Sequence, residues 1–204
     1  MEKEVSRREF LKVSVATGAV LSMAPSIALA QELKAIQLIR PQIGSGNPLM
    51  PLLWKRISSR EFNPEPLPLE VLSNILWAAF GINRPDGRRT APSASNRQEI
   101  DIYVAAANGL YLYDAKTNLL NPILAEDIRG TTGRQSYVKL ASVNLVYVAD
   151  YSKMGTATDE DKIFLSAADT GFISENVYLY CASEGLVTVV RANIDRPALA
   201  TLMK

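Results

Sequence analysis

An Asn108-Gly109 dipeptide between two β-rich runs constrains the fold of this chain more than any other sequence feature. Residues 100–107 precede it and residues 110–113 follow it, and both runs are rich in aliphatic and aromatic side chains. Asn-Gly favours the tight turns that join neighbouring antiparallel strands. The sequence therefore predicts a β-hairpin at this point and, with it, a mostly antiparallel sheet.

Further β-rich segments extend this hairpin. Residues 119–124 follow a turn and predict a third strand of the meander. Residues 143–149 form a continuous apolar run bounded by Asp150, which predicts an inner strand. Residues 186–190 read Leu-Val-Thr-Val-Val and predict a buried strand after a helix.

Helical signals lie between and around these strands, after an extended arm over residues 31–50 that is expected to wrap a partner. They occur at residues 50–55, 66–80 and 161–184 and in a last helix that begins at Asp195 and Pro197. The acids Asp159, Glu160 and Asp161 stand where the helix dipole favours negative charge. The expected fold class is α+β, with a mostly antiparallel sheet and helices on both faces.

The first 30 residues resemble a twin-arginine export signal. Arg7 and Arg8 precede an apolar stretch at residues 13–29, and Ala28-Leu29-Ala30 fits a cleavage site of small residues. A membrane anchor is the alternative, but Thr, Gly, Ser and Pro interrupt a stretch that is also short for a span. We expect residues 1–30 to be a leader, residues 31–204 to form one exported or periplasmic domain, and no stable membrane anchor to remain after cleavage.

Composition excludes several kinds of chemistry. The formal net charge is +1, and the chain beyond the leader has equal numbers of acidic and basic residues, which argues against nucleic-acid binding. There is no histidine and a single cysteine, Cys181. Imidazole-based catalysis, an imidazole metal site and an internal disulfide are therefore excluded, and no catalytic side chain or metal ligand is predicted. An enzyme of this composition needs a cofactor for redox chemistry.

Two polar segments are candidates for holding such a cofactor. Residues 88–98 combine guanidinium, hydroxyl and amide groups with small residues, which suits a phosphorylated planar ligand, although a solvated turn fits them as well. Arg56, Ser58 and Arg60 alternate, so in an extended segment they would share a face.

These segments resemble motifs of the FMN-dependent nitroreductase family. That family has an Arg-x-Ser-x-Arg segment, a Pro-Ser-x-x-Asn-x-Gln segment and a helix followed by Gly-Leu, in the order seen here over roughly residues 50–200. Here Gln98-Glu99 stands where many members have Gln-Pro. The hairpin at residues 109–114 also resembles the azoline dehydrogenase branch, but Pro-Ser-Ala-Ser-Asn departs from the motif of that branch.

The resemblance implies a role for each matching residue. Arg56 would bind the FMN phosphate, Ser58 the phosphate or ribityl hydroxyls, and Arg60 the N1 and O2 edge of the ring. The remaining cofactor-binding positions that it implies are Ser93, Ser95, Asn96, Gly185 and Leu186. Arg191 could also reach a phosphate.

The resemblance further implies a homodimer with the long helix at its centre and FMN at two interface sites. The expected function is two-stage electron or hydride transfer from a reduced small-molecule donor through FMN to a small organic acceptor. Nicotinamide is the usual donor in the family, but a periplasmic location argues against it. The alternatives are an FMN-binding protein that only relays electrons and an interaction domain without flavin.

Overall fold

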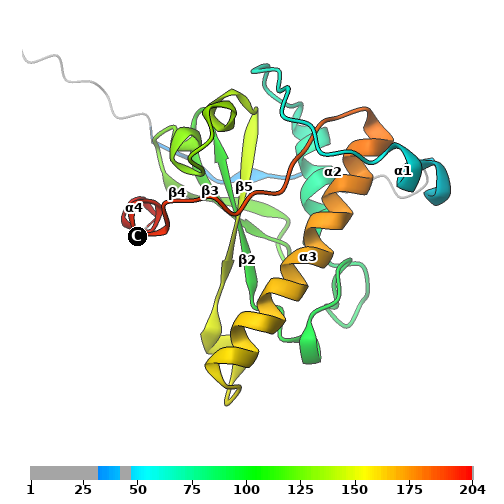
Figure 1. Cartoon of the computed structure of the whole chain (residues 1–204), viewed down its shortest axis with the longest axis vertical. Helices are drawn as coiled ribbons and strands as arrows, with labels where there is room; N and C mark the ends of the chain where they lie inside the picture. Colours follow the sequence, from blue (N-terminus) through cyan, green and yellow to red (C-terminus); the bar gives the residue numbers. More distant parts are fainter. Residues whose placement is uncertain (1–31, 42–46, 204) are drawn as a thin grey trace, which may run out of the picture. The chain divides into compact units, whose positions relative to one another are not determined.

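The computed structural model describes residues 32–41 and 47–203. The predicted leader therefore lies outside the described residues. The sheet contains β1 (Ile36–Gln37), β2 (Ile100–Ala106), β3 (Gly109–Asp114), β4 (Leu119–Leu124) and β5 (Val143–Ala149). Its strand order is β1-β4-β3-β2-β5, and every neighbouring pair is antiparallel (Figure 1).

The predicted hairpin is confirmed. Tyr103 pairs with Leu112, Val104 with Tyr111, and Ala106 with Gly109. Gly109 has φ +150°, and a Cβ at this position would lie 2.5 Å from the carbonyl oxygen of Leu124 on β4. Glycine is needed here because the neighbouring strand approaches the backbone closely.

The predicted helices are present as α1 (Leu49–Lys55), α2 (Leu69–Phe80), α3 (Asp159–Glu184) and α4 (Arg196–Leu202). Thr158 caps α3 by accepting a hydrogen bond from the Asp161 N–H at 3.1 Å, and Gly185 ends it with φ 69°. At the end of α2, a Cβ on Gly81 would lie 2.3 Å from Cδ1 of Trp77. Close packing against that indole therefore requires glycine.

The two faces of the sheet carry different helices, as the sequence predicts. Alternate residues Ile100, Ile102 and Val104 of β2 pack with α2 and α3 in the main core, which includes Leu76 and Ile173. Ala105 points to the opposite face and packs in a smaller cluster with Leu110, Ile128 and Leu199 of α4. The fold is thus α+β, with helices on both faces of an antiparallel sheet.

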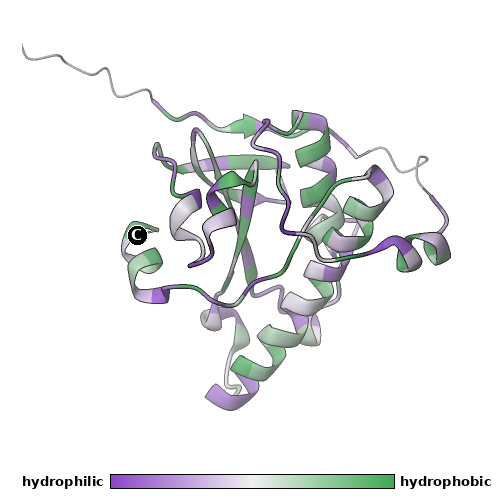
Figure 2. Cartoon of the chain, turned by 45° about the horizontal axis from the view of Figure 1, so that its top comes forward, coloured by the Kyte–Doolittle hydropathy of each residue, from purple (hydrophilic) through white to green (hydrophobic). Residues whose placement is uncertain are grey.

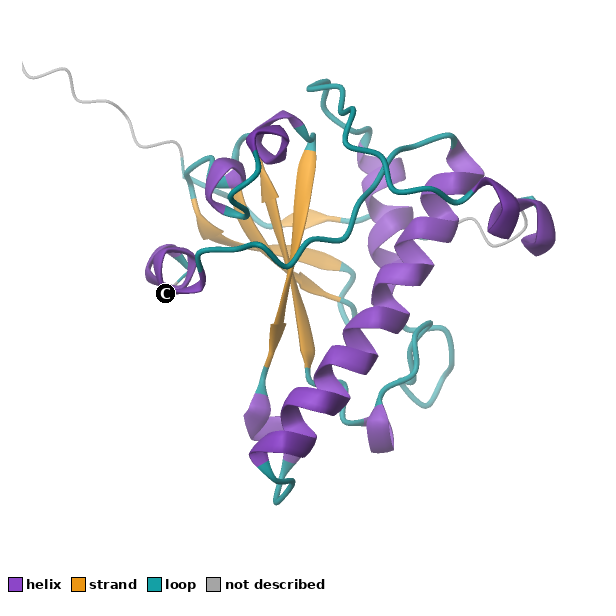
Figure 3. Cartoon of the chain, in the orientation of Figure 1, coloured by secondary structure: helices purple, strands orange, loops and turns teal. Residues whose placement is uncertain are grey.

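Two strand predictions are wrong in part. The β5 strand forms as expected, but it is an edge strand rather than an inner one, because only β2 pairs with it. Residues 186–190 form no strand. They belong to an extended crossover, residues 186–195, that joins α3 to α4 as a loop in Figure 3. Val187 and Val190 are 44% and 52% exposed, so the segment is not buried as predicted.

The arm before α1 pairs partly within its own chain. Leu38 N–H donates to the Asn118 carbonyl at 2.9 Å, and the Ile39 N–H donates to Ser73 Oγ at 3.0 Å. Residues 32–41 therefore cover the β4 edge of the sheet. Over the described ranges, none of the helices has the length and apolar character that a membrane crossing needs.

Candidate functional site

The segment from Arg56 to Arg60 lies against the second half of α3. Ser58 Oγ and Tyr178 Oη are 2.8 Å apart, and the Arg56 guanidinium carbon lies 5.3 Å from the centre of the Tyr178 ring. The Ser59 N–H donates to the Thr188 carbonyl at 3.1 Å. A cation over an aromatic face is attracted to the π electrons, so Tyr178 contacts this segment through both its ring and its hydroxyl.

Tyr178 also fixes the turn that follows α3. The Val190 N–H donates to Tyr178 Oη at 2.9 Å, and the same oxygen shares a hydrogen bond with Ser58 Oγ in which either hydroxyl can donate. Just before this point, the Leu186 N–H donates to the Cys181 carbonyl at 2.8 Å. The structure thus brings Arg56, Ser58, Gly185 and Leu186 to one end of α3, whereas Arg60 lies exposed at the end of its segment.

The residues after Pro92 form a compact loop with unusual backbone angles. Ser95, Asn96 and Gln98 have φ of 54°, 55° and 51°. Side-chain bonds hold this conformation: Ser93 Oγ accepts from the Gln98 N–H at 3.0 Å, and Asn96 Oδ1 accepts from Gln98 Nε2 at 3.0 Å. Non-glycine residues in this region are costly and tend to cluster at functional sites.

This loop is attached to the first half of α3. The Ala94 N–H donates to Asp169 Oδ2 at 2.9 Å, and Arg89 Nε donates to Gln98 Oε1 at 2.8 Å. Asp169 and Tyr178 are nine residues apart on α3. This separation corresponds to about 13 Å along the axis. Within one chain, the predicted site residues therefore form two groups: Ser93, Ser95 and Asn96 in one, and Arg56, Ser58, Gly185 and Leu186 in the other.

A cavity of about 1010 Å³ runs along the free edge of β5. Its walls come from β5, α3 and the crossover, and they include Tyr147, Cys181, Leu186 and Val189. Burial raises the pKa values of Tyr147 and Cys181, each to about 12. These shifts indicate a poorly hydrated wall that favours neutral groups.

Arg191 lies in this wall, and both of its terminal nitrogens have partners within the chain. Nη1 donates to the Thr132 carbonyl at 2.9 Å and Nη2 to Asn144 Oδ1 at 2.6 Å. A Cβ on Gly133 would lie 2.3 Å from Nη1, so the guanidinium is closely packed. Burial lowers the pKa of Arg191. Arg191 therefore bonds groups of its own chain, and its guanidinium is not presented as a free site for an anion.

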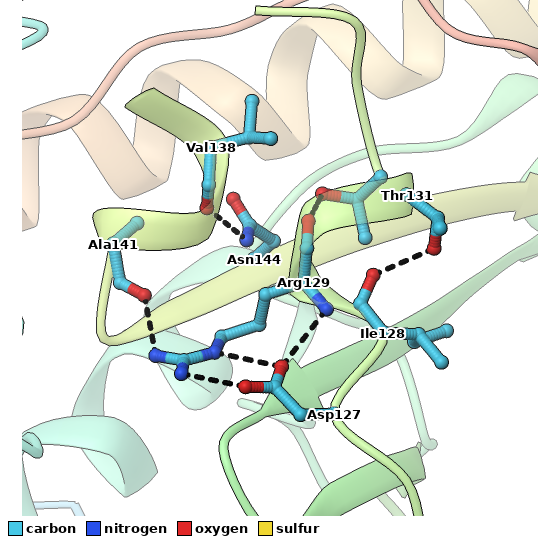
Figure 4. A network of polar contacts seen from close by, with 8 residues as sticks. Asp127, Ile128, Arg129, Thr131, Val138, Ala141 and Asn144 are labelled. Atoms are coloured by element: carbon cyan, nitrogen blue, oxygen red, sulfur yellow. Dashed lines mark hydrogen bonds and ion pairs between the residues drawn. The ribbon is translucent and has the colours of Figure 1, made fainter. Parts of the chain in front are cut away.

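Arg191 bonds Thr132, and a second arginine, Arg129, fixes the segment of residues 127–141 that contains it (Figure 4). Arg129 donates to both carboxylate oxygens of Asp127, at 2.9 and 2.7 Å, and to the Ala141 carbonyl at 3.0 Å. Asn144 Nδ2 donates to the Val138 carbonyl at 2.8 Å. A bidentate pair of this kind fixes the orientation of both side chains. It holds residues 127–141 beside β5 and thereby shapes one end of the cavity.

Three residues at the site were not identified from the sequence: Tyr178, Asp169 and Glu99. Tyr178 and Asp169 lie in α3, where helical spacing assigns them only to a helix face. Asp169 is nevertheless only 3% exposed, and Glu99 is fully buried. The sequence holds one signal for Asp169 and Glu99: each is an acidic residue next to apolar or small residues. Such a residue indicates a partner in the core when it is buried, because ionised carboxylates are rarely buried without partners.

Comparisons with known proteins identify this architecture. A solved structure from Ralstonia eutropha JMP134, a candidate nitroreductase, has a TM-score of 0.80 and 44% identity, and covers 88% of this chain and 85% of that one. A chain of the E. coli microcin synthetase McbBCD complex with truncated pro-MccB17 has a TM-score of 0.60 at 20% identity, over 96% of this chain and 79% of that one. At this identity the likeness is evidence of a shared fold alone. Fold and sequence similarity together place the chain in the class of α+β oxidoreductases.

The sequence profile described as the nitroreductase family matches residues 53–204. A candidate nitroreductase of Methanocaldococcus jannaschii is 30% identical over 148 residues, which are 68% of this chain and 75% of that protein. The chain belongs to the nitroreductase family, whose members generally bind flavin.

Proposed function

We propose that this protein is an FMN-dependent oxidoreductase that acts as a homodimer in the periplasm after export by the twin-arginine route. A reduced small-molecule donor and then a small organic acceptor would use one pocket in turn. Membership of an oxidoreductase family supports the reaction class. The twin arginines and the apolar stretch of the first 30 residues support the location.

One observation carries the proposal: the contact of Ser58 with Tyr178, 120 residues further along the chain, at 2.8 Å. Together with the Ser59–Thr188 hydrogen bond, it brings the Arg-x-Ser-x-Arg segment onto the Gly185 turn. These are two of the three motifs that the family uses for its cofactor. A guanidinium and a hydroxyl then lie at one helix end, and these groups suit a phosphorylated ligand.

The exposed face of α3 supports the homodimer. Residues on this face are apolar or small, namely Ile163, Phe164, Ala167, Ala168, Gly171 and Phe172. Phe164 is 71% exposed and Phe172 50%, whereas the inward face carries Ser166, Asp169 and Ser174. In Figure 2 the first turn of this helix is purple, and green, hydrophobic ribbon follows it. An apolar face turned outward favours a second copy of the chain as its cover.

Pairing two α3 helices antiparallel about Gly171 would also bring the two groups of site residues together. A Cβ at Gly171 has no neighbour within 4 Å, so a second helix can approach there. In such a pair Tyr178 lies opposite the partner's Phe164. Asp169 of one chain and Tyr178 of the other would then be about 8 Å apart along the axis instead of about 13 Å.

These side chains fit FMN in chemistry. When bound, the flavin supplies the reversible electron and hydride transfer that a chain without histidine lacks. Arg56 would hold the phosphate and Ser58 the phosphate or ribityl hydroxyls, while Arg60 would place positive charge at the N1 and O2 edge. Ser93, Ser95 and Asn96 of the other subunit would line the same site, and the backbone at Gly185 and Leu186 would contact the ring.

The test is to purify the protein and record its visible spectrum, then supply electron donors and acceptors one at a time. We expect yellow protein with FMN bound and sustained oxidation of a donor that depends on an acceptor. Yellow protein without turnover would leave an electron-relay role, and colourless protein without flavin affinity would remove the proposal. Arg56→Ala should weaken FMN binding, and Arg134→Ala is its matched control, because the Arg134 side chain is 60% exposed and pairs with Asp195 at the surface.

A further inference from the structure

Two acidic side chains meet in the core beneath the loop of residues 93–98. Glu99, directly before β2, is fully buried, and Asp169 of α3 is 3% exposed. Asp169 is a close neighbour of Glu99, because it raises the pKa of Glu99 both through its charge and as a hydrogen-bond partner. Within the described part of the chain, no donor meets hydrogen-bond geometry at either Glu99 carboxylate oxygen. This arrangement needs an explanation, because a buried ion without a partner costs several kcal/mol, about the stability of a small domain.

Protonation supplies the explanation. Two ionised carboxylates are both acceptors and repel each other, whereas a protonated carboxyl can donate to its neighbour. Burial raises the pKa of Glu99, and the nearby Asp169 raises it further. Asp169 already accepts the Ala94 N–H at 2.9 Å, so it acts as a hydrogen-bond acceptor here. Glu99 is therefore the partner that carries the proton.

We propose that Glu99 and Asp169 share one proton and that this acid pair positions the loop of residues 93–98 on α3. The inference rests on the proposed function in one respect, because only that function assigns cofactor contacts to the loop. Asp169 holds the loop through Ala94, and Glu99 holds Asp169. Because Ser95, Asn96 and Gln98 have positive φ, the loop depends on such an anchor to keep its conformation.

The other charged groups nearby are committed elsewhere or act weakly. Arg97 on the loop lowers the pKa of Glu99, but less than burial and Asp169 raise it. Arg89 donates to Gln98 and to the Phe80 carbonyl. Asp101 and Asp150 are both paired with Lys153, at 2.8 and 3.7 Å. Burial is the largest influence on the pKa of Glu99; the backbone of Glu99 itself opposes the rise, and Asp169 adds to it.

The proposal fixes the direction of a pH effect. The pKa of Glu99 is higher in the folded protein than in the unfolded chain. The stability that this difference contributes is therefore fully present below the pKa of the unfolded chain, and it is lost as pH rises through the pKa of the folded protein. Loss of the proton leaves two facing carboxylates, which weakens the anchor at Ala94. The loop should open locally as pH rises, before the rest of the domain unfolds.

Amide hydrogen exchange on protein without added flavin tests this. The reporters are the N–H groups of Ala94, Asn96, Arg97 and Gln98, all of which are hydrogen-bonded. After correction for intrinsic exchange, their protection should fall by up to about tenfold per pH unit as pH rises from the pKa of Glu99 in the open state to its folded pKa, and should level off above that value. In Glu99→Gln the amide donates to Asp169 without a titrating proton, so protection should stay high and independent of pH. Asp101→Asn, a nearby surface carboxylate, should behave as wild type.

Wild-type protection that is flat with pH would overturn the proposal, as would a Glu99→Gln protein with the wild-type profile. If Glu99→Gln fails to fold, infrared spectra of the wild type decide, because a protonated acid band must persist above the pKa of exposed carboxyls. Its absence would also overturn the proposal. Neither measurement needs bound flavin, so a colourless protein with the expected exchange profile would refute the cofactor assignment and leave the acid pair intact.

Discussion

The hydroxyl groups of Ser58 and Tyr178 lie 2.8 Å apart, and Tyr178 accepts the Val190 N–H through the same oxygen at 2.9 Å. One phenol thus joins the segment after α1 to the crossover after α3. Its ring also lies beneath the Arg56 guanidinium. The arrangement makes Tyr178 a positioning residue for the proposed phosphate-binding segment.

Replacing Tyr178 with Phe should therefore weaken FMN binding while the ring remains in place. Each lost hydrogen bond contributes about 1 kcal/mol, so the Kd for FMN should rise about fivefold or more. Fluorescence titration with FMN measures the change. Tyr180→Phe is the matched control, since Tyr180 lies on the same helix near Asn74. Equal effects of the two variants would contradict the role of Tyr178.

Arg56 and Arg191 should differ in how they affect recognition of phosphate. Arg56→Ala should weaken FMN binding by about tenfold to a hundredfold, as expected for loss of a charged hydrogen bond, and leave riboflavin binding little changed. Arg191→Ala should lower the melting temperature, because it leaves Asn144 and the Thr132 carbonyl without their donor. The ratio of FMN to riboflavin affinity should stay at the wild-type value in Arg191→Ala. A collapse of this ratio in that variant would assign the phosphate to Arg191 instead.

Arg60 should act on the flavin potential. Removing positive charge near the N1 and O2 edge destabilises the anionic reduced form, so Arg60→Ala should lower the midpoint potential or weaken flavin binding. Potentiometric titration of the bound flavin measures the potential. If both quantities equal those of the wild type, Arg60 has no contact with the ring.

The buried thiol gives a test of the cavity wall. With the pKa of Cys181 raised to about 12, iodoacetamide should leave the folded protein unmodified near neutral pH and react after unfolding. The same shift predicts that stability is lost as pH rises from the unfolded pKa through the folded value. Cys181→Ala should reduce this alkaline loss. Rapid modification of folded protein at neutral pH would show an exposed thiol and contradict the structure.

The dimer proposal depends on Gly171. Gly171→Leu should block close approach of a second helix and give a monomer that no longer retains FMN, as measured by light scattering and absorbance. Gly171→Ala adds one methyl group in open space and a stronger helix former, so the subunit itself should be as stable or more stable. A Gly171→Leu dimer that keeps FMN would place the subunit contact elsewhere.

The sequence predicted best those elements whose signals are local. Asn108-Gly109 fixed the hairpin because few other conformations suit that dipeptide between β-rich runs, and the acidic start and Gly185 set the ends of α3. The position of β5 was predicted wrongly because a continuous apolar run indicates burial on both faces but not the number of neighbouring strands. Here the cavity and the crossover flank its second edge.

Other features depended on distant partners. Residues 186–190 have high β propensity, but their backbone groups bond Ser59 and Tyr178 rather than a strand. The pairing of Glu99 with Asp169 joins residues 70 positions apart, and helical spacing gives no indication of it. The predicted cofactor residues fall into two groups within one chain. Only a second subunit would reunite them.

The most direct test of the shared site uses mixed dimers of Arg56→Ala and Asn96→Ala subunits, isolated by two different affinity tags. Each homodimer should bind FMN poorly, since every site in it lacks one contact. In the mixed dimer one site carries both substitutions and the other carries neither, so we predict that one FMN is bound tightly per dimer. If the mixed dimer binds no more FMN than the two homodimers, the residues do not meet across subunits and the account is wrong.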